Sequence, residues 1–200
     1  MMTETEVHGG LKAGCYDTLP NLTLNEQMLA QWNELPPLSF TEDELTFAKS
    51  LQASLDPSVL AGTAQQSFVP QEINSSGILL EQVFHIPQTF RQSMQGSSDL
   101  GDVSWIAPLG QVFTTCAPYG VQVHIWQATA AFGSSLGMKG YALCGKGDGR
   151  GCAYSLLNPA VIEKAKEEFE NLKAGKHYEC GIPEEVKAPN RFKPSLRMGG

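Results

Sequence analysis

The stretch from residue 78 to residue 117 decides the predicted fold class: it reads ILLEQVFHI at 78–86, GSSDLGDVSW at 96–105 and QVFTTCA at 111–117. The first and last segments are rich in β-branched and aromatic residues, which favour strands. The middle segment is polar and leads into a helix that we expect to start near Asp102. Strand-like runs that alternate with helices predict an α/β fold.

Helical periodicity flanks this stretch on both sides. Apolar residues recur at helical spacing in residues 21–31 and 41–55, and Thr41 with Glu44 fits the spacing of a capping box. Two consecutive prolines separate these two predicted helices. The run 160–173 has apolar residues on one face and alternating charges on the other, which predicts a further helix.

The composition narrows the class of protein. The 200 residues carry a net charge of −7 with 18% charged and 42% hydrophobic residues, which fits one globular unit and argues against a nucleic-acid partner. We expect no membrane span, because that needs about 20 consecutive apolar residues. The opening residues lack a secretion signal, and an odd number of cysteines argues against a disulfide framework, so we expect a cytoplasmic protein with reduced thiols. The cysteines are Cys15, Cys116, Cys144, Cys152 and Cys180.

The densest polar cluster lies in the segment 96–105. Its glycines flank the hydroxyl of Ser98 and the carboxylates of Asp99 and Asp102. Such a turn can direct backbone N–H groups and acidic side chains toward one ligand. The alternative is a surface turn that caps the following helix.

A second candidate is His124, which lies inside the apolar, β-prone run VQVHIWQ at 121–127. A lone histidine in such a run is usually a core residue. It becomes a metal ligand only where other donors converge, because zinc sites take three or four protein ligands. The sequence contains no HxxH, HExxH or CxxC spacing, so it predicts no complete metal site by itself.

The glycine-rich segment CGKGDGRGC at 144–152 does not match a phosphate loop, because the required spacing of glycines and of a following Ser or Thr is missing. A flexible loop is the prediction favoured here. Four glycines in a helix interior would cost roughly 3–4 kcal/mol relative to alanine, so any helix should break at this segment.

Three segments together resemble the aminobenzoyl-glutamate hydrolase branch of the M20 metal-dependent amidohydrolases. They are 13–21, 96–105 and 124–127, and weaker similarity runs from about residue 14 to residue 189. The resemblance implies the C-terminal half of a zinc-peptidase-like catalytic domain, a mixed sheet flanked by helices. It divides the chain into the end of a lid or dimerisation domain at 1–20, the half-domain at 21–182 and a tail at 183–200.

The same resemblance implies the chemistry. Members of the family hold two ions of zinc or another divalent metal, and His124 matches the last metal ligand. Ser98, Asp99 and Asp102 match the segment that lines the substrate end of the cleft. The resemblance also implies that the family's early His-x-Asp and Glu-Glu motifs, which supply the other ligands and the general base, belong to the first half of that domain and lie outside this chain.

The resemblance therefore implies that the chain is one part of an enzyme. The resemblance implies hydrolysis of amide bonds in small-molecule N-acyl amino acids or aminobenzoyl-glutamate-like substrates, with the isolated chain inactive. It implies partners as well, either in a homo- or hetero-oligomer or as a complementing N-terminal half. The alternative is a non-catalytic remnant or interaction module that retains the fold fragment.

The family usually has an alanine-rich helix where this chain has its four glycines. The codons for Gly145 to Cys152, read one base along, can spell Gly-Lys-Ala-Met-Ala-Ala-Ala. A short compensated frameshift is therefore a hypothesis for the glycines, and the nucleotide sequence tests it.

Overall fold

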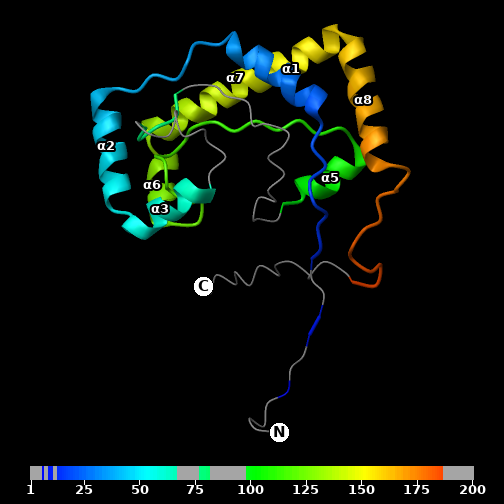
Figure 1. Ribbon diagram of the computed structural model, residues 1–200, viewed down its shortest axis with the longest axis horizontal. Coiled ribbons are helices and arrows are strands. Elements are labelled where there is room, and N and C mark those ends of the chain that lie inside the picture. The colour runs from blue at the N-terminus through cyan, green and yellow to red at the C-terminus, as the bar shows by residue number, and fades with distance from the viewer. Residues whose placement is uncertain (1–5, 7–8, 11–12, 67–76, 82–97, 187–200) are drawn as a thin grey trace, which may run out of the picture.

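The computed structural model describes residues 6, 9–10, 13–66, 77–81 and 98–186. Within these ranges the secondary structure consists of helices (Figure 1). They are α1 (Leu22–Asn33), α2 (Glu42–Ala53), α3 (Pro57–Gln66), α5 (Leu100–Ile106), α6 (Trp126–Phe132), α7 (Ser135–Leu157) and α8 (Pro159–Lys173). Across the described part of the chain, no helix is both long and apolar enough to cross a bilayer.

The predicted α/β class, with its mixed sheet, is wrong for the residues that the structure describes. Residues 111–117 belong to no strand, and the described ranges contain a single isolated parallel bridge, between Pro20 and Leu109. Residues 77–81 are not a strand either, and the rest of the predicted strand, 82–86, lies outside the described residues.

These two β-prone segments do lie side by side without forming a sheet. The hydroxyl of Thr115 donates to the carbonyl of Leu80 at 2.6 Å, and the amide of Tyr119 donates to the carbonyl of Ile78 at 2.8 Å. β-branched and aromatic residues favour strands because their side chains pack well at half-buried positions. A segment outside any sheet can occupy such positions too.

Helix α7 is the longest of the described helices, and α1, α6 and α8 pack against it (Figure 1). Helix α1 packs along it, α6 and α2 lie near its beginning, and α8 turns back from its end and also contacts α1. The helices predicted at 21–31, 41–55 and 160–173 are confirmed as α1, α2 and α8. The predicted capping box is confirmed too, because Thr41 and Glu44 exchange both of its hydrogen bonds at the start of α2.

The predicted break and flexible loop at 144–152 are wrong, because α7 runs unbroken through this segment. The glycines at alternate positions fall on opposite faces of the helix. Gly147 and Gly151 are buried against α1, and a Cβ added at Gly147 would overlap the indole of Trp32. Gly145 and Gly149 face open space. Close packing against α1 therefore offsets the low helix propensity of glycine, which is only a weak preference.

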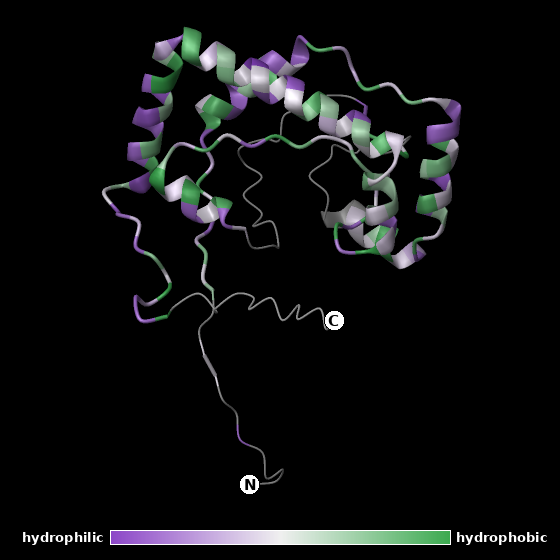
Figure 2. Cartoon of the chain, turned by 180° about the vertical axis from the view of Figure 1, so that it is seen from behind, coloured by the Kyte–Doolittle hydropathy of each residue, from purple (hydrophilic) through white to green (hydrophobic). Residues whose placement is uncertain are grey.

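The buried core is small. Ala48, Leu79 and Leu136 form its centre, and partly buried side chains such as Phe40 and Leu45 pack around them. Large hydrophobic side chains are also exposed, among them Leu156 and Leu157 at the corner where α7 meets α8, and Figure 2 shows the hydropathy along this part of the chain.

The predicted division into 1–20, 21–182 and 183–200 is not tested by the described residues and stays a prediction. The structure describes only part of the predicted lid segment. It describes the predicted tail only as far as Val186.

Candidate functional site

Two of the three segments that carry the resemblance lie against each other. The amide of Leu19 donates to the hydroxyl of Ser104 at 2.8 Å, and the indole N–H of Trp105 donates to the carbonyl of Asp17 at 2.9 Å. Gly101 allows this close approach, because a Cβ at that position would overlap the carbonyl oxygen of Tyr16. The segment 13–21 is thereby fixed along α5.

An aromatic cluster holds the same region together. The ring of Tyr16 lies 5.4 Å from the ring of Trp105 and 5.3 Å from the ring of Tyr178, measured between centroids. Tilted aromatic pairs at this spacing stabilise beyond the area they bury. Three segments that are distant in the sequence therefore meet at one place.

Ser98, Asp99 and Asp102 line one shallow depression of about 350 Å³ beside this cluster. Ala13, Gly14 and Cys15 line it as well. We call this the acidic depression. The structure thus brings together the three residues that the sequence predicted as substrate contacts. Their role as contacts stays a prediction.

The turn before α5 also has the capping character of the alternative interpretation. The hydroxyl of Ser98 accepts from the amide of Leu100 at 3.2 Å, and the carbonyl of Ser98 accepts from the amide of Gly101 at 3.1 Å. Asp99, at the N-cap position, makes no side-chain cap. The Asp99 side chain is therefore not used to cap α5.

Tyr178 is the residue of this site that the sequence did not single out. Burial and the neighbouring Asp102 carboxylate raise the pKa of Tyr178 to about 12. Tyrosine is protonated at neutral pH with or without this shift, so the Tyr178 hydroxyl can donate to the neighbouring Asp102 carboxylate. No spacing motif links a tyrosine near the C-terminus to an aspartate on α5, and the contact exists only because the chain folds back.

His124 lies elsewhere. Its side chain is exposed, two residues before α6 begins. Figures 1 and 2 place α6 and α5 on opposite sides of the molecule. The structure therefore does not bring His124 together with Ser98, Asp99 and Asp102.

A metal centre needs converging donors, and the described ranges contain no group of three or more His, Cys, Asp or Glu side chains that could hold an ion. His124 alone does not fit a catalytic zinc or a comparable divalent metal, which takes about three protein ligands. The residues that the structure describes thus do not hold the predicted metal pair by themselves. The ligand role of His124 stays a prediction.

In the glycine-rich segment 144–152, Cys144 makes a contact within α7. Cys144 donates through its Sγ to Asp148 at 3.4 Å on the same face of α7. Burial raises the pKa of Cys144 to about 11, and the Asp148 side chain adds to this shift. A thiol with a raised pKa is a poor nucleophile at neutral pH.

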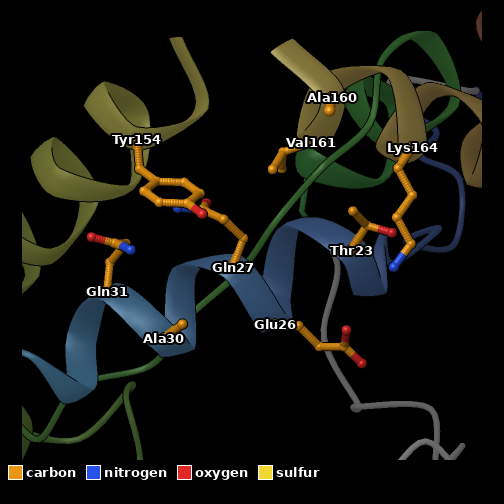
Figure 3. Close-up of a pocket in the computed structure, with 9 residues that line it drawn as sticks. All are labelled: Thr23, Glu26, Gln27, Ala30, Gln31, Tyr154, Ala160, Val161 and Lys164. Atoms are coloured by element: carbon orange, nitrogen blue, oxygen red, sulfur yellow. The ribbon is translucent and has the colours of Figure 1, made fainter. Parts of the chain in front are cut away.

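A second depression, of about 430 Å³, lies between α1 and the region where α7 meets α8 (Figure 3). Gln27 is buried at its edge, where its amide nitrogen donates to the carbonyl of Gly151 and its amide oxygen accepts from Ser155, both at 3.4 Å. The lining mixes apolar and polar groups without a nucleophile and base pair. It consists of Thr23, Glu26, Gln27, Ala30, Gln31, Tyr154, Ala160, Val161 and Lys164.

Comparison with known proteins shows a similarity to a hydrolase subunit. A relative from Escherichia coli (strain K12), one of the subunits of p-aminobenzoyl-glutamate hydrolase, is 27% identical to the chain over 194 residues. The alignment covers 93% of this chain, and the chain spans 40% of the length of that relative. The predicted resemblance to the aminobenzoyl-glutamate hydrolase branch is confirmed. No family model and no solved structure matches the chain.

Proposed function

We propose that this chain is part of an amidohydrolase that cleaves the amide bond of N-acyl amino acids of the p-aminobenzoyl-glutamate type. The observation that carries the proposal is the similarity to the E. coli p-aminobenzoyl-glutamate hydrolase chain along 93% of this sequence. The acidic depression supports it, because it gathers Ser98, Asp99 and Asp102 from the most specific of the resembling segments.

The charges of the depression suggest which end of the substrate it takes. An aminobenzoyl-glutamate carries two carboxylates on its amino-acid end and an amine on its acyl end. Like charges about 4 Å apart repel by roughly 1 kcal/mol in water and about 4 kcal/mol near a protein surface. Asp99 and Asp102 therefore disfavour the glutamate end. They accept hydrogen bonds from a donor such as the aryl amine.

Most of the groups needed for cleavage would come from residues outside the described ranges. The resemblance implies two divalent ions, with zinc as one candidate metal, and His124 as one of their ligands. These ions would lower the pKa of a bound water that attacks the amide carbonyl. Because the described residues do not fit the pair alone, we assign this chain the substrate-binding part and no catalytic step.

We also propose that the chain works in an oligomer. The relative is named as a subunit, and this chain carries large exposed apolar side chains on α5, including Val103 and Ile106. Exposed apolar surface of this kind is typical of interfaces.

A complementation assay tests the function. The purified chain is mixed with the part of the E. coli relative that the alignment does not cover, and release of p-aminobenzoate from p-aminobenzoyl-glutamate is followed with zinc or manganese present. We expect no turnover by the 200-residue chain alone. The mixture should release p-aminobenzoate at a rate that neither part reaches alone.

Asp102→Asn is the informative variant, and Glu163→Gln, an exposed position on α8, is its control. We expect Asp102→Asn to raise KM severalfold for the amine-bearing substrate and less for benzoyl-glutamate, which lacks the amine. Turnover by the chain alone would refute the partial role. Equal KM effects on both substrates would refute the orientation.

The second candidate is a non-catalytic remnant or interaction module. It is favoured by the small core and by the lack of a converging donor set among the described residues. A neighbouring reading frame with the His-x-Asp and Glu-Glu motifs would support the enzyme, and its absence together with failed complementation would support the remnant.

A further inference from the structure

Two cysteines lie on segments that run side by side although they are far apart in the sequence. A Cβ on Gly14 would lie 3.6 Å from the carbonyl oxygen of Gly181, and the rings of Tyr16 and Tyr178 lie 5.3 Å apart. In the sequence, Cys15 lies between Gly14 and Tyr16, and Cys180 lies between Tyr178 and Gly181. The two cysteines therefore lie on adjoining stretches of the two segments, next to both contacts.

Both thiols are accessible. Cys15 and Cys180 are exposed free cysteines, whereas Cys116 and Cys144 are partly buried. Burial raises the pKa of both Cys116 and Cys144, so these two thiols are less reactive. Cys152 is exposed as well, but it lies in α7, away from the two facing segments.

We propose that Cys15 and Cys180 form a reversible disulfide that ties the N-terminal segment to the C-terminal segment beside the acidic depression. A disulfide needs Cα atoms about 4.4–6.8 Å apart, a spacing that the neighbouring contacts on both sides bring within reach. Cys15 lines the depression together with Asp102. The bond would therefore fix one wall of that depression.

The oxidant is a peroxide. One thiolate attacks a peroxide oxygen, and the O–O bond breaks to give a sulfenic acid and water. The second thiolate then attacks the sulfenic sulfur, the S–S bond forms and a second water leaves. Two thiols and one hydrogen peroxide give one disulfide and two waters, and a small dithiol reductant reverses the step.

Peptide mapping tests the pairing directly, because trypsin places each of the five cysteines in a different peptide. Cys15 falls in residues 13–49 and Cys180 in residues 177–187. The full chain at micromolar concentration is treated with hydrogen peroxide, blocked with N-ethylmaleimide and digested. We expect the peptide 13–49 joined to 177–187 as the main disulfide, at a yield that does not change on tenfold dilution.

The same oxidation in 8 M urea is the control that needs no variant. In the unfolded chain, no geometry favours Cys15 with Cys180 over the other pairs, so their linked peptide should lose its dominance there. A mainly different pairing in the folded chain, no disulfide, or an equal yield in urea would overturn the proposal.

Three serine variants give a second readout. Oxidation should raise the thermal midpoint of the wild-type chain, because a cross-link between distant positions restricts the unfolded state. Cys15→Ser and Cys180→Ser should each abolish this rise, and Cys152→Ser should keep it. Loss of the rise in Cys152→Ser alone would overturn the proposal.

Discussion

Asn21 joins three parts of the molecule through one residue. Its Oδ1 accepts from the backbone amide of Leu24 at 3.0 Å, and its Nδ2 donates to the carbonyl of Ala165 at 2.8 Å. Its backbone amide donates to the carbonyl of Leu109 at 3.1 Å. The residue is 1% exposed. We expect Asn21→Ala to lower the free energy of unfolding by about 1–3 kcal/mol, because it removes an N-cap and a buried hydrogen bond. Urea denaturation measures the change.

Asn33 provides the matched control at the other end of α1. It is exposed, so Asn33→Ala should change the free energy of unfolding by less than about 0.5 kcal/mol. Equal effects of the two substitutions would show that the cap at Asn21 contributes nothing specific.

Glu44 makes stability depend on pH. Its carboxylate accepts from Lys139 at 2.6 Å, from Ser135 at 2.7 Å and from the amide of Thr41 at 2.8 Å. The Lys139 side chain is the main cause that lowers the pKa of Glu44 from 4.5 to about 2. Since the folded pKa is the lower one, the stabilisation is complete above about pH 4.5 and is lost as the pH falls toward 2.

Thermal melts of the wild type and Glu44→Gln at pH 6, 4 and 2.5 measure this effect. The difference in midpoint should be largest at pH 6 and should shrink as the pH falls. Lys139→Gln removes the main partner, so it should remove most of the same pH dependence. A midpoint difference that stays constant from pH 6 to pH 2.5 would contradict the argument.

Local spacing predicted part of these residue networks. The capping box of Thr41 and Glu44 follows from four consecutive positions, and the grouping of Ser98, Asp99 and Asp102 follows from one turn. The contacts of Glu44 with Lys139, and of Asp102 with Tyr178, join segments that only tertiary folding brings together. Single-sequence patterns carry no signal for such pairs.

At the scale of elements, α7 allows a direct comparison of glycines within one helix. Gly147 faces Trp32, which is 5% exposed, and Gly149 faces open space. We expect Gly147→Ala to destabilise by about 1–3 kcal/mol, because the added methyl overpacks the contact with α1. Gly149→Ala should stabilise by up to about 1 kcal/mol, because alanine is the better helix former. Chemical denaturation of the two variants gives both values.

The same pair bears on the frameshift hypothesis, in which alanine would replace glycine at both positions. If both substitutions stabilise, the α1–α7 contact accepts a side chain and the alanine-rich sequence fits this fold. If Gly147→Ala destabilises the protein while Gly149→Ala stabilises it, the packing against α1 requires a glycine at position 147.

Helices were predicted better than strands for a physical reason. A helix such as α8 satisfies its hydrogen bonds within one segment, so periodicity and caps suffice to predict it. A strand needs a partner, and residues 111–117 have β-rich composition without one. The helix break predicted at 144–152 was wrong for a similar reason. Gly147 packs against Trp32, which is distant in the sequence, so a short stretch of sequence cannot predict this contact.

At the scale of the whole molecule, the arrangement leaves much apolar surface uncovered. Leu156 is 76% exposed and Leu157 is 81% exposed, at the corner where α7 meets α8. Burial of one leucine side chain contributes about 1.5–3 kcal/mol. Two adjacent leucines at a protruding corner therefore favour association with a second polypeptide.

We expect the purified chain to associate as its concentration rises from about 1 to about 100 μM, a range in which small apolar interfaces form. Light scattering coupled to size exclusion measures the mass. The double substitution Leu156→Gln with Leu157→Gln should shift the association to at least about tenfold higher concentration, which corresponds to about 1.4 kcal/mol. Glu163→Gln with Lys166→Gln, on the exposed polar face of α8, should leave it unchanged. A monomer at every concentration would mean that this corner does not drive association. An equal shift in both double variants would place the interface elsewhere.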